Sequence, residues 1–229
     1  LVRQVALTDT IICPSEGMLN NLVDEGIPKS KLALVRTPVR MKRHDPDADR
    51  QPEVVYFGRF GPEKNITLLI DAFADFVRQH PGWKLRLIGD GPERANLQDG
   101  IESVGLSDKV EMLPFLEQNV LFERIARSRI MVMMSSVLEN WPLVIPEAVM
   151  CGLYPVVPAH GGMKEAIEWL GAGTSYRSGD RSSLTEALGS AIKADSAAIE
   201  SARDRIEDEL APERYVTEVI RLYRSLIES

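Results

Sequence analysis

The sequence predicts an α/β fold, in which a mostly parallel β-sheet carries helices on both faces. From Glu53 onward, short apolar runs typical of buried strands alternate with longer stretches whose apolar residues recur at helical spacing. Glycine, proline and aspartate residues mark the connections between them. Because strands and helices that alternate at this interval form βαβ units, we expect a Rossmann-like domain.

Each element of this region is predicted from its own stretch. The first helix follows a strand at 53–58 and ends at the Pro81-Gly82 pair. Its apolar face consists of Ile66, Leu69, Ile70, Phe73 and Val77. Later strands are expected at 83–89, 109–115, 129–135, 154–158 and 174–177, and later helices at 93–105, at 119–127, from 146 onward and at 163–171.

The two ends of the chain do not continue this alternation. Residues 10–36 predict a strand, a helix and a second strand, which are too few elements for a complete domain. The polar stretch at 40–53 is interpreted as a linker or exposed loop. Helices are then expected at 182–194, 197–210 and 211–229. The last helix aligns an apolar face that must pack on another surface, formed by Tyr215, Val219, Leu222 and Leu226.

The composition argues against several classes of partner. The chain of 229 residues has a net charge of −7 and no basic run, so neither nucleic acid nor an anionic membrane surface is expected. Cys13 and Cys151 lack metal-ligand spacing, which is typical of buried cysteines in a reducing compartment. No stretch matches a membrane span or a signal peptide. We expect a cytoplasmic protein and, because it does not begin with methionine, a piece of a longer chain.

Two carboxylates, Glu139 and Glu147, lie eight residues apart with Pro142 and Pro146 between them. Prolines inside a helix remove a backbone donor and clash with the preceding turn, which excludes one continuous helix. An apolar run precedes the pair, and Pro146 suits the first position of a helix, so a strand, a loop and a helix are expected. Both glutamates would then border a pocket at the carboxyl edge of the sheet, where open α/β folds bind ligands.

The loop GRFGPEKN at 58–65 also leaves a strand, and it offers two cations before a helix. Arg59 and Lys64 could supply charge-assisted donors to a diphosphate, although both could equally be solvated loop cations. Neither the Walker nor the GxGxxG glycine pattern follows a strand, which disfavours a P-loop nucleotidase or a nicotinamide dehydrogenase. Trp141, between the two glutamates, could wall a pocket or cap the core.

Several motifs occur in an order that a known family shares. GRFGPEKN is followed by IGDGPER, ENWPLVIPE, AVMCGLYPVV, HGGMKEAIE and SGD. Together they closely resemble the C-terminal domain of family 4 retaining glycosyltransferases, which have the GT-B architecture of two facing Rossmann-like domains. The resemblance implies that 1–38 ends the N-terminal domain and crosses over, 39–211 binds a nucleotide sugar, and 212–229 returns to brace the N-terminal domain.

The resemblance assigns residues to both ends of one donor. Arg59 and Lys64 would neutralise the diphosphate, and Glu147 would accept hydrogen bonds from the ribose hydroxyls. Glu139 would lie beside the donor sugar. The amides of Leu143 and Val144 would contact phosphate or sugar oxygens, and the backbone near Phe115 would border the base. The implied catalytic residues are Glu139, Arg59 and Lys64, and the implied substrate-binding residues are Gly58, Arg59, Lys64, Phe115, Glu139, Leu143, Val144 and Glu147.

The implied activity is transfer of a sugar from a nucleotide-diphosphate sugar to an acceptor, with retention of configuration. No metal or other cofactor is expected, because cations and helix dipoles serve the diphosphate in this architecture. The acceptor, whether a glycan, a lipid-linked sugar or a small molecule, would bind mainly on the N-terminal domain, which could also place the enzyme at the inner face of a membrane. The alternatives are a GT-B sugar-nucleotide epimerase and a non-catalytic nucleotide-binding or interaction domain.

The sequence departs from the family's common pattern in two short stretches, at 36–39 and at 140–142, and at the single residue Asn65. Asn140 and Pro142 stand where glycines are common after the first glutamate, and proline cannot donate a backbone hydrogen bond. RTPV at 36–39 stands where an asparagine-glycine turn is common, and Asn65 replaces a frequent glycine. Contacts to the donor sugar are therefore expected to differ, while the charged residues are retained.

Overall fold

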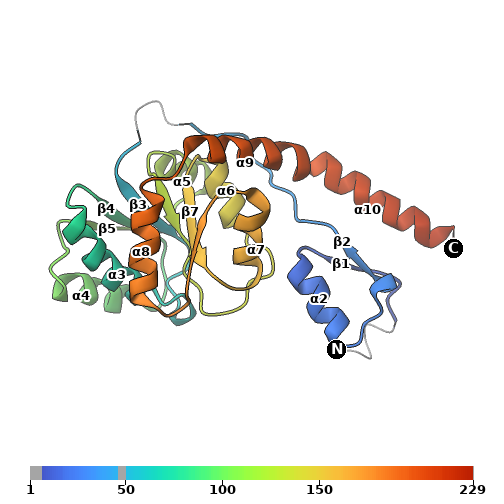
Figure 1. The fold of residues 1–229 in the computed structure, drawn as a ribbon, viewed down its shortest axis with the longest axis horizontal. Coiled ribbons are helices and arrows are strands. Elements are labelled where there is room, and N and C mark those ends of the chain that lie inside the picture. Colours follow the sequence, from blue (N-terminus) through green and yellow to red (C-terminus); the bar gives the residue numbers. More distant parts are fainter. Residues whose placement is uncertain (1–6, 46–49, 229) are drawn as a thin grey trace.

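The computed structural model describes residues 7–45 and 50–228 (Figure 1). Its main body contains a six-stranded parallel sheet with the order β5-β4-β3-β6-β7-β8. The strands are β3 (Glu53–Phe57), β4 (Lys84–Ile88), β5 (Val110–Leu113), β6 (Ile130–Val132), β7 (Tyr154–Pro158) and β8 (Thr174–Tyr176). The predicted α/β fold is confirmed.

Helices cover both faces of this sheet (Figure 1). One face packs on α3 (Ile66–Gln79), α4 (Arg94–Ser103) and α8 (Arg181–Ala191). The other packs on α5 (Gln118–Ile125), α6 (Val144–Met150), α7 (Gly161–Leu170) and α9 (Ser196–Glu209). Val54 of β3 enters the first core and its neighbour Val55 enters the second. Since side chains alternate along a strand and both cores are apolar, the strands are mostly apolar, apart from a buried ion pair between Glu53 of β3 and Arg86 of β4.

The strand order reverses at β3. The chain moves from β3 outward to β4 and β5, then returns to the other side of β3 with β6 and continues to β8. The loops that follow β3 and β6 therefore leave the same edge of the sheet in neighbouring positions. Such a reversal opens a crevice at the carboxyl ends of the strands, which is the usual ligand site of open α/β sheets.

The first described part of the chain forms a small separate unit (Figure 1). It consists of β1 (Ile11–Cys13), α2 (Glu16–Asp24), a 3-10 turn η1 (Lys29–Lys31) and β2 (Leu32–Leu34). The Ser15 side chain begins α2 by accepting a hydrogen bond from the Met18 amide at 3.1 Å. Within residues 7–45 and 50–228, β1 and β2 pair in parallel with each other and with no other strand.

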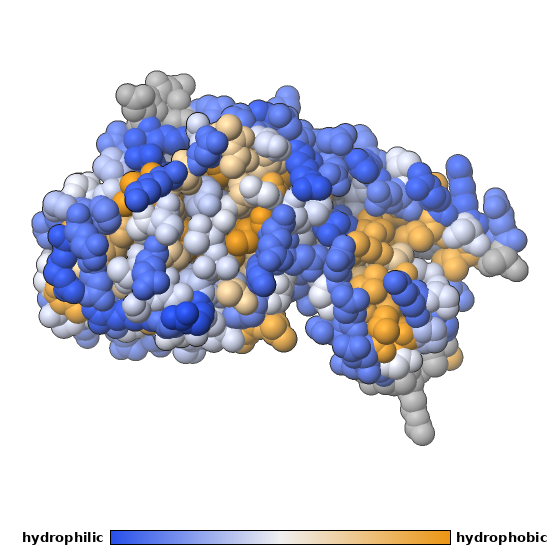
Figure 2. All heavy atoms as spheres, in the orientation of Figure 1, coloured by the Kyte–Doolittle hydropathy of each residue, from blue (hydrophilic) through white to orange (hydrophobic). Residues whose placement is uncertain are grey.

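The last helix, α10 (Pro212–Ile227), leaves the main body and extends past the β1-α2-β2 unit (Figure 1). Hydrophobic surface is visible in this region of Figure 2. The exposed apolar side chains here include Ile12, Val23, Val216, Ile220, Tyr223 and Ile227. No described residue of α10 is buried, so packing of its apolar face on another surface stays a prediction, as does the division into three parts.

Several element boundaries differ from those predicted. Helix α6 begins at Val144, so Pro146 is its third residue and not its first. The first N–H groups of a helix have no partner within the helix, and a proline is therefore tolerated there. Helix α7 already begins at Gly161, and β6 ends at Val132, three residues before the predicted strand end.

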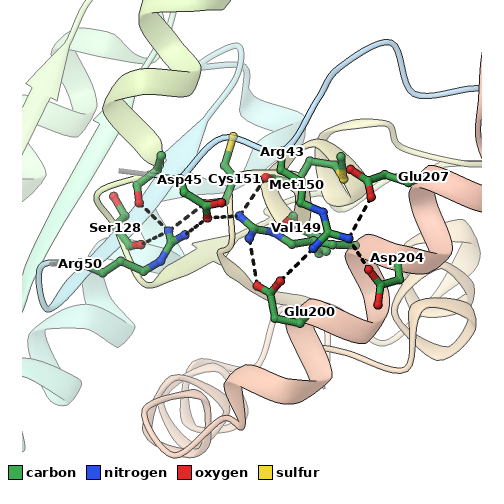
Figure 3. Close-up of polar contacts among 12 residues, drawn as sticks. Arg43, Asp45, Arg50, Ser128, Val149, Met150, Cys151, Glu200, Asp204 and Glu207 are labelled. Carbon is green, nitrogen blue, oxygen red and sulfur yellow. Dashed lines mark hydrogen bonds and ion pairs between the residues drawn. The ribbon is translucent and has the colours of Figure 1, made fainter. Parts of the chain in front are cut away.

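The polar stretch at 40–53 is not a free linker where it is described. Residues 46–49 lie outside the described residues, but Arg43 and Arg50 on either side of them bind the main body (Figure 3). Arg43 forms ion pairs with Glu200, Asp204 and Glu207 of α9. Arg50 donates a hydrogen bond to the carbonyl of Cys151 at 2.7 Å.

Arg203 of α9 also binds the carboxyl end of α6. It donates to the carbonyls of Val149 and Met150, each at 3.0 Å, and its side chain is 3% exposed. Its guanidinium pairs with Asp45 at 2.8 Å and with Glu200 at 2.9 Å. Cations at the carboxyl end of a helix are attracted by the negative pole of the helix dipole. Arg50 and Arg203 thus stabilise α6, the short helix that carries Glu147.

Both cysteines are unpaired and fully buried, as predicted. Burial raises the pKa of the Cys151 thiol to about 12. A thiol with so high a pKa is a poor nucleophile at neutral pH, so Cys151 is a packing residue of the second core.

Candidate functional site

Two adjoining cavities lie at the carboxyl ends of β3, β4 and β6, each with a volume of about 290 Å³. They share one wall, formed by Phe57, Gly58, Arg59 and Val144. The first cavity is further lined by Tyr56, Lys64, Met131, Val132, Met133, Met134, Glu139 and Pro142. The second is further lined by Ile88, Gly89, Asp90, Phe115, Leu116 and Leu121. We call them the charged cavity and the apolar cavity.

A short turn after β3 brings Lys64 to the charged cavity. The 3-10 turn η2 (Pro62–Lys64) ends at Asn65, whose backbone is left-handed with φ of 44°. Glycine adopts this conformation readily and asparagine is among the residues that tolerate it, so Asn65 can replace a glycine here. The Lys64 Nζ donates to the Glu139 Oε1 at 2.8 Å. The structure therefore places one predicted cation and one predicted carboxylate in direct contact.

Glu139 is carried by a loop that neighbouring loops hold on both sides. On one side, the amide and hydroxyl of Ser136 donate to the Glu63 carbonyl at 2.9 Å and 2.8 Å. On the other, the Gly162 amide donates to the Glu139 carbonyl at 2.7 Å. A Cβ at Gly162 would lie 1.8 Å from the Asn140 carbonyl oxygen, so only glycine permits this approach. The position of Glu139 thus depends on the loops after β3 and β7.

Arg59 lies on the shared wall with its backbone fixed and its side chain exposed. The Tyr56 hydroxyl donates to the Arg59 carbonyl at 2.9 Å. The Arg59 side chain is 68% exposed and lies 4.0 Å from a Glu63 carboxylate oxygen. A pair at this distance in water is weak, so the guanidinium can turn toward an anion in the cleft.

Apart from Arg59 and Asp90, the side chains that line the apolar cavity are aromatic or branched aliphatic. Phe115, which is 73% exposed, stands at its mouth beside Leu116 and Leu121. Its floor includes Gly89, where a Cβ would lie 1.9 Å from the Gly58 carbonyl oxygen. The IGDGPER turn, one of the motifs that carry the family resemblance, therefore also forms part of the cleft. A planar ring system of moderate polarity fits such a surface.

Helix α6 contributes the remaining predicted residues. Val144 lines both cavities, whereas Leu143 and Glu147 are absent from the described linings. In the described part of the chain, no hydrogen bond occupies the amides of Leu143 or Val144, which leaves both donors available beside the cleft. Desolvation by burial raises the pKa of the Glu147 carboxyl. These residues lie next to the cavities, and their predicted contacts stay predictions.

The structure bears on two residues for which the sequence allowed alternative roles, Trp141 and His160. Trp141 is 7% exposed and packs in the second core, so of its two interpretations the core residue holds. His160, a loop histidine that the sequence offers either as a general base or as a structural or solvated residue, immediately precedes α7 and is not among the described lining residues of either cavity. The sequence reasoning missed Tyr56, Ile88 and Leu121 as lining residues, although Tyr56 and Ile88 lie at the carboxyl ends of predicted strands, where such residues can be sought.

Two searches of the described residues gave no candidates. Across residues 7–45 and 50–228, no group of three or more His, Cys, Asp or Glu side chains is placed to hold a metal ion. No helix in the same part of the chain combines the length and apolar character that crossing a bilayer requires.

Comparisons with known proteins give relatives for nearly the whole chain. An exopolysaccharide phosphotransferase of Streptomyces coelicolor is 32% identical over 166 residues, which are 71% of this chain and 17% of that protein. The putative colanic acid biosynthesis glycosyltransferase WcaL of Escherichia coli is 23% identical over 231 residues, covering 95% of this chain and 57% of that protein. The chain thus spans well under two thirds of either relative.

Solved structures share the fold. The HepE protein of Anabaena, crystallised with UDP, superposes with a TM-score of 0.80 at 19% identity, over 97% of this chain and 64% of that one. Sucrose-phosphate synthase of Thermosynechococcus elongatus gives a TM-score of 0.81 at 22% identity, over 99% and 61%. At such identities the likeness concerns the fold alone. The family model described as glycosyl transferases group 1 matches residues 40–208, and the chain therefore belongs to that family.

Proposed function

We propose that this chain is the donor-binding half of a glycosyltransferase that moves a sugar from a nucleotide-diphosphate sugar to an acceptor, with retention of configuration. The observation that carries the proposal is the contact of Lys64 with Glu139 in the charged cavity, directly beside the apolar cavity. The two cavities together offer a cation, a carboxylate and an apolar slot in one cleft. A diphosphate, a sugar and a base require these three surfaces.

The donor would lie along the shared wall. Its base would occupy the apolar cavity near Phe115, and its diphosphate would meet Arg59, Lys64 and the free amides of Leu143 and Val144. Its sugar would face Glu139, whose carboxylate can accept hydrogen bonds from sugar hydroxyls. The UDP in the related HepE structure supports a uridine nucleotide as the first one to test.

The chemistry requires stabilisation of a leaving group. The bond between the sugar's anomeric carbon and the diphosphate oxygen breaks, and a bond from the acceptor oxygen to the same face of that carbon forms. The acceptor's proton passes to the departing diphosphate, so no protein nucleophile is needed. Negative charge grows on the diphosphate in the transition state, where Arg59 and Lys64 stabilise it more than in the ground state. We expect no divalent metal, because these cations supply the charge.

The remaining half of the site is proposed to come from a second Rossmann-like domain. Such a domain would face the cleft, bring the acceptor and cover the apolar surface of α10 and the β1-α2-β2 unit. We place the reaction in the cytoplasm, or at the inner face of a membrane to which the second domain would bind. The chain alone is expected to bind nucleotide and to transfer little sugar.

Calorimetric titration with UDP, GDP and ADP in the presence of EDTA tests the proposal. We expect saturable binding of one nucleotide, unchanged when Mg²⁺ replaces EDTA, and weaker binding by the Arg59→Ala variant. Absence of binding at millimolar concentrations of all three would contradict a donor site in this chain. Release of free nucleotide without a glycosylated product, from a preparation that includes the second domain, would indicate an epimerase.

Replacing Glu147 by glutamine is expected to stabilise the fold and to weaken nucleotide binding. Burial raises the pKa of its carboxyl, so the folded protein binds this proton more tightly than the unfolded chain does. Stability therefore falls as pH rises from about 4.3, the ordinary value, through the folded pKa. Glu147→Gln should raise the free energy of unfolding at pH 7 and remove this part of the pH dependence. It should also weaken nucleotide binding about tenfold, since a charged acceptor for the ribose is lost.

Denaturant unfolding at pH 4 to 7 and nucleotide titration measure both effects. Glu123→Gln, an exposed residue of α5, is the matched control and should change neither quantity. A stabilised Glu147→Gln variant that binds nucleotide as well as the wild type would remove Glu147 from the ribose site while leaving its burial confirmed.

A further inference from the structure

Trp141, on the loop between the two glutamates, belongs to a stack of four side chains that is centred on Trp169 of α7. Its ring meets that of Trp169 on α7 edge to face, with centroids 5.6 Å apart and planes at 75°. The guanidinium carbon of Arg36 lies 5.1 Å from the Trp141 centroid and 5.2 Å from that of Trp169. Arg205 of α9 lies 4.8 Å from the Trp169 centroid. Cations over aromatic faces at these distances are attracted by the rings.

Arg36 also binds the small amino-terminal unit through a shared carboxylate. Its Nη2 lies 3.5 Å from the Glu165 Oε1. The two oxygens of Glu165 accept hydrogen bonds from the amides of Glu16 and Gly17, at 2.8 Å and 2.9 Å. These amides are at the amino end of α2, where a carboxylate is favoured by the helix dipole. Arg36 therefore contacts Glu165, which binds the amino end of α2, and also the rings of Trp169 on α7 and Trp141 on the Glu139 loop.

Two buried nitrogens in this stack lack hydrogen-bond partners among the described residues: Arg36 Nε and Trp141 Nε1. A buried donor without a partner lowers stability. The Trp141 ring is consequently held by packing in the second core and by its contacts with Arg36 and Trp169, without a hydrogen bond to a described residue. Arg36 is thus one of the groups that hold this loop.

The contact between Arg36 and Trp141 joins the two stretches, 36–39 and 140–142, in which the sequence departs from the family's common pattern. Arg36 begins the RTPV stretch, and Trp141 lies between Asn140 and Pro142. A residue 105 positions earlier in the chain thus contacts the loop that carries Glu139.

We propose that Arg36 is a positioning residue for the donor site. Its guanidinium holds Trp141 against α7, and this contact keeps Glu139 in reach of Lys64. It also connects the loop to the β1-α2-β2 unit, so that a displacement of that unit changes the position of Glu139. The effect on the donor rests on the proposed function of the cleft, whereas the effect on the loop does not.

Arg36→Met tests the proposal, with Arg205→Met as the matched control. Both variants lose an arginine stacked on Trp169, but Arg205 contacts Trp169 and Glu209 and, among the described residues, does not stack on Trp141. Hydrogen exchange of the Gly162 amide, which is bonded to the Glu139 carbonyl, reports the position of the loop. Titration with UDP reports the donor site.

In Arg36→Met, exchange at Gly162 should accelerate and UDP affinity should fall, each by about threefold to thirtyfold. Arg205→Met should leave both near wild type, even where it lowers the melting temperature as much. Arg36→Lys, which keeps the charge near Glu165 without a planar guanidinium, should lie between them. It also serves if Arg36→Met fails to fold.

Equal effects of Arg36→Met and Arg205→Met on Gly162 exchange, or no effect of either, would overturn the positioning role. If wild-type protein binds none of the nucleotides, the proposed function fails. The exchange comparison still decides whether Arg36 holds the loop. Faster Gly162 exchange with unchanged UDP affinity would confine Arg36 to the loop and overturn its role in donor binding.

Discussion

Replacing Lys64 by methionine is expected to weaken binding of the nucleoside diphosphate by about 10- to 100-fold, because a charge-assisted hydrogen bond contributes roughly 1.5–3 kcal/mol. Lys64 lines the charged cavity, and its side chain is 21% exposed. The affinity for the corresponding nucleoside, which lacks phosphates, should change much less. Calorimetric titration of wild type and variant with both ligands measures this difference.

Lys164→Met is the control for general loss of a lysine. Lys164 lies on α7, pairs with Glu168 at 3.5 Å and has a side chain that is 49% exposed. This substitution should leave both affinities unchanged. If Lys64→Met weakens nucleoside and nucleoside diphosphate equally, Lys64 acts by holding Glu139 and its loop, and its assignment to the phosphates is wrong.

Replacing Arg203 by methionine is expected to lower the free energy of unfolding by about 2 kcal/mol, because two charge-assisted hydrogen bonds in a buried position are lost. Gly152 and His44 also donate to the same two carbonyls, so these do not lose every partner. The ionic partners of Arg203, Asp45 and Glu200, are 61% and 53% exposed and become solvated after the change. Guanidinium chloride unfolding measures the loss.

Arg43→Met separates buried from exposed arginines in the same cluster (Figure 3). Among the residues that the structure describes, Arg43 pairs with the carboxylates of Glu200, Asp204 and Glu207, whose side chains are 47% to 73% exposed. Its removal should cost less than about 1 kcal/mol. A loss as large as that of Arg203→Met would show that the stability of this region comes from the ion pairs and not from the end of α6.

The fold could be predicted because each element carries its own local signal. The five residues predicted for the core face of α3 are all buried, and β7 has the predicted bounds at 154–158. The start of α6 could not be predicted in the same way. A proline fits both the first and third positions of a helix, and the sequence favoured the first.

The candidate site was predictable to the extent that its residues follow strands. Gly58, Arg59, Lys64, Glu139 and Val144 all lie between β3 or β6 and the end of the first turn of the helix that follows, and the structure brings them together. No comparable signal in the sequence indicates the contact of Arg36 with Trp141. Neither periodicity nor a motif connects two residues so far apart in the chain, and their approach depends on how the first unit packs on α7.

The shared wall of the two cavities separates two kinds of recognition. Phe115 and Leu116, after β5, line only the apolar cavity, whereas Glu139 and Pro142, after β6, line only the charged one. The strand order puts these loops on opposite sides of β3. One loop can therefore accumulate substitutions while the other stays unchanged. If the base and the diphosphate bind as proposed, substitutions after β5 can change the base preference without altering the contacts to the phosphates.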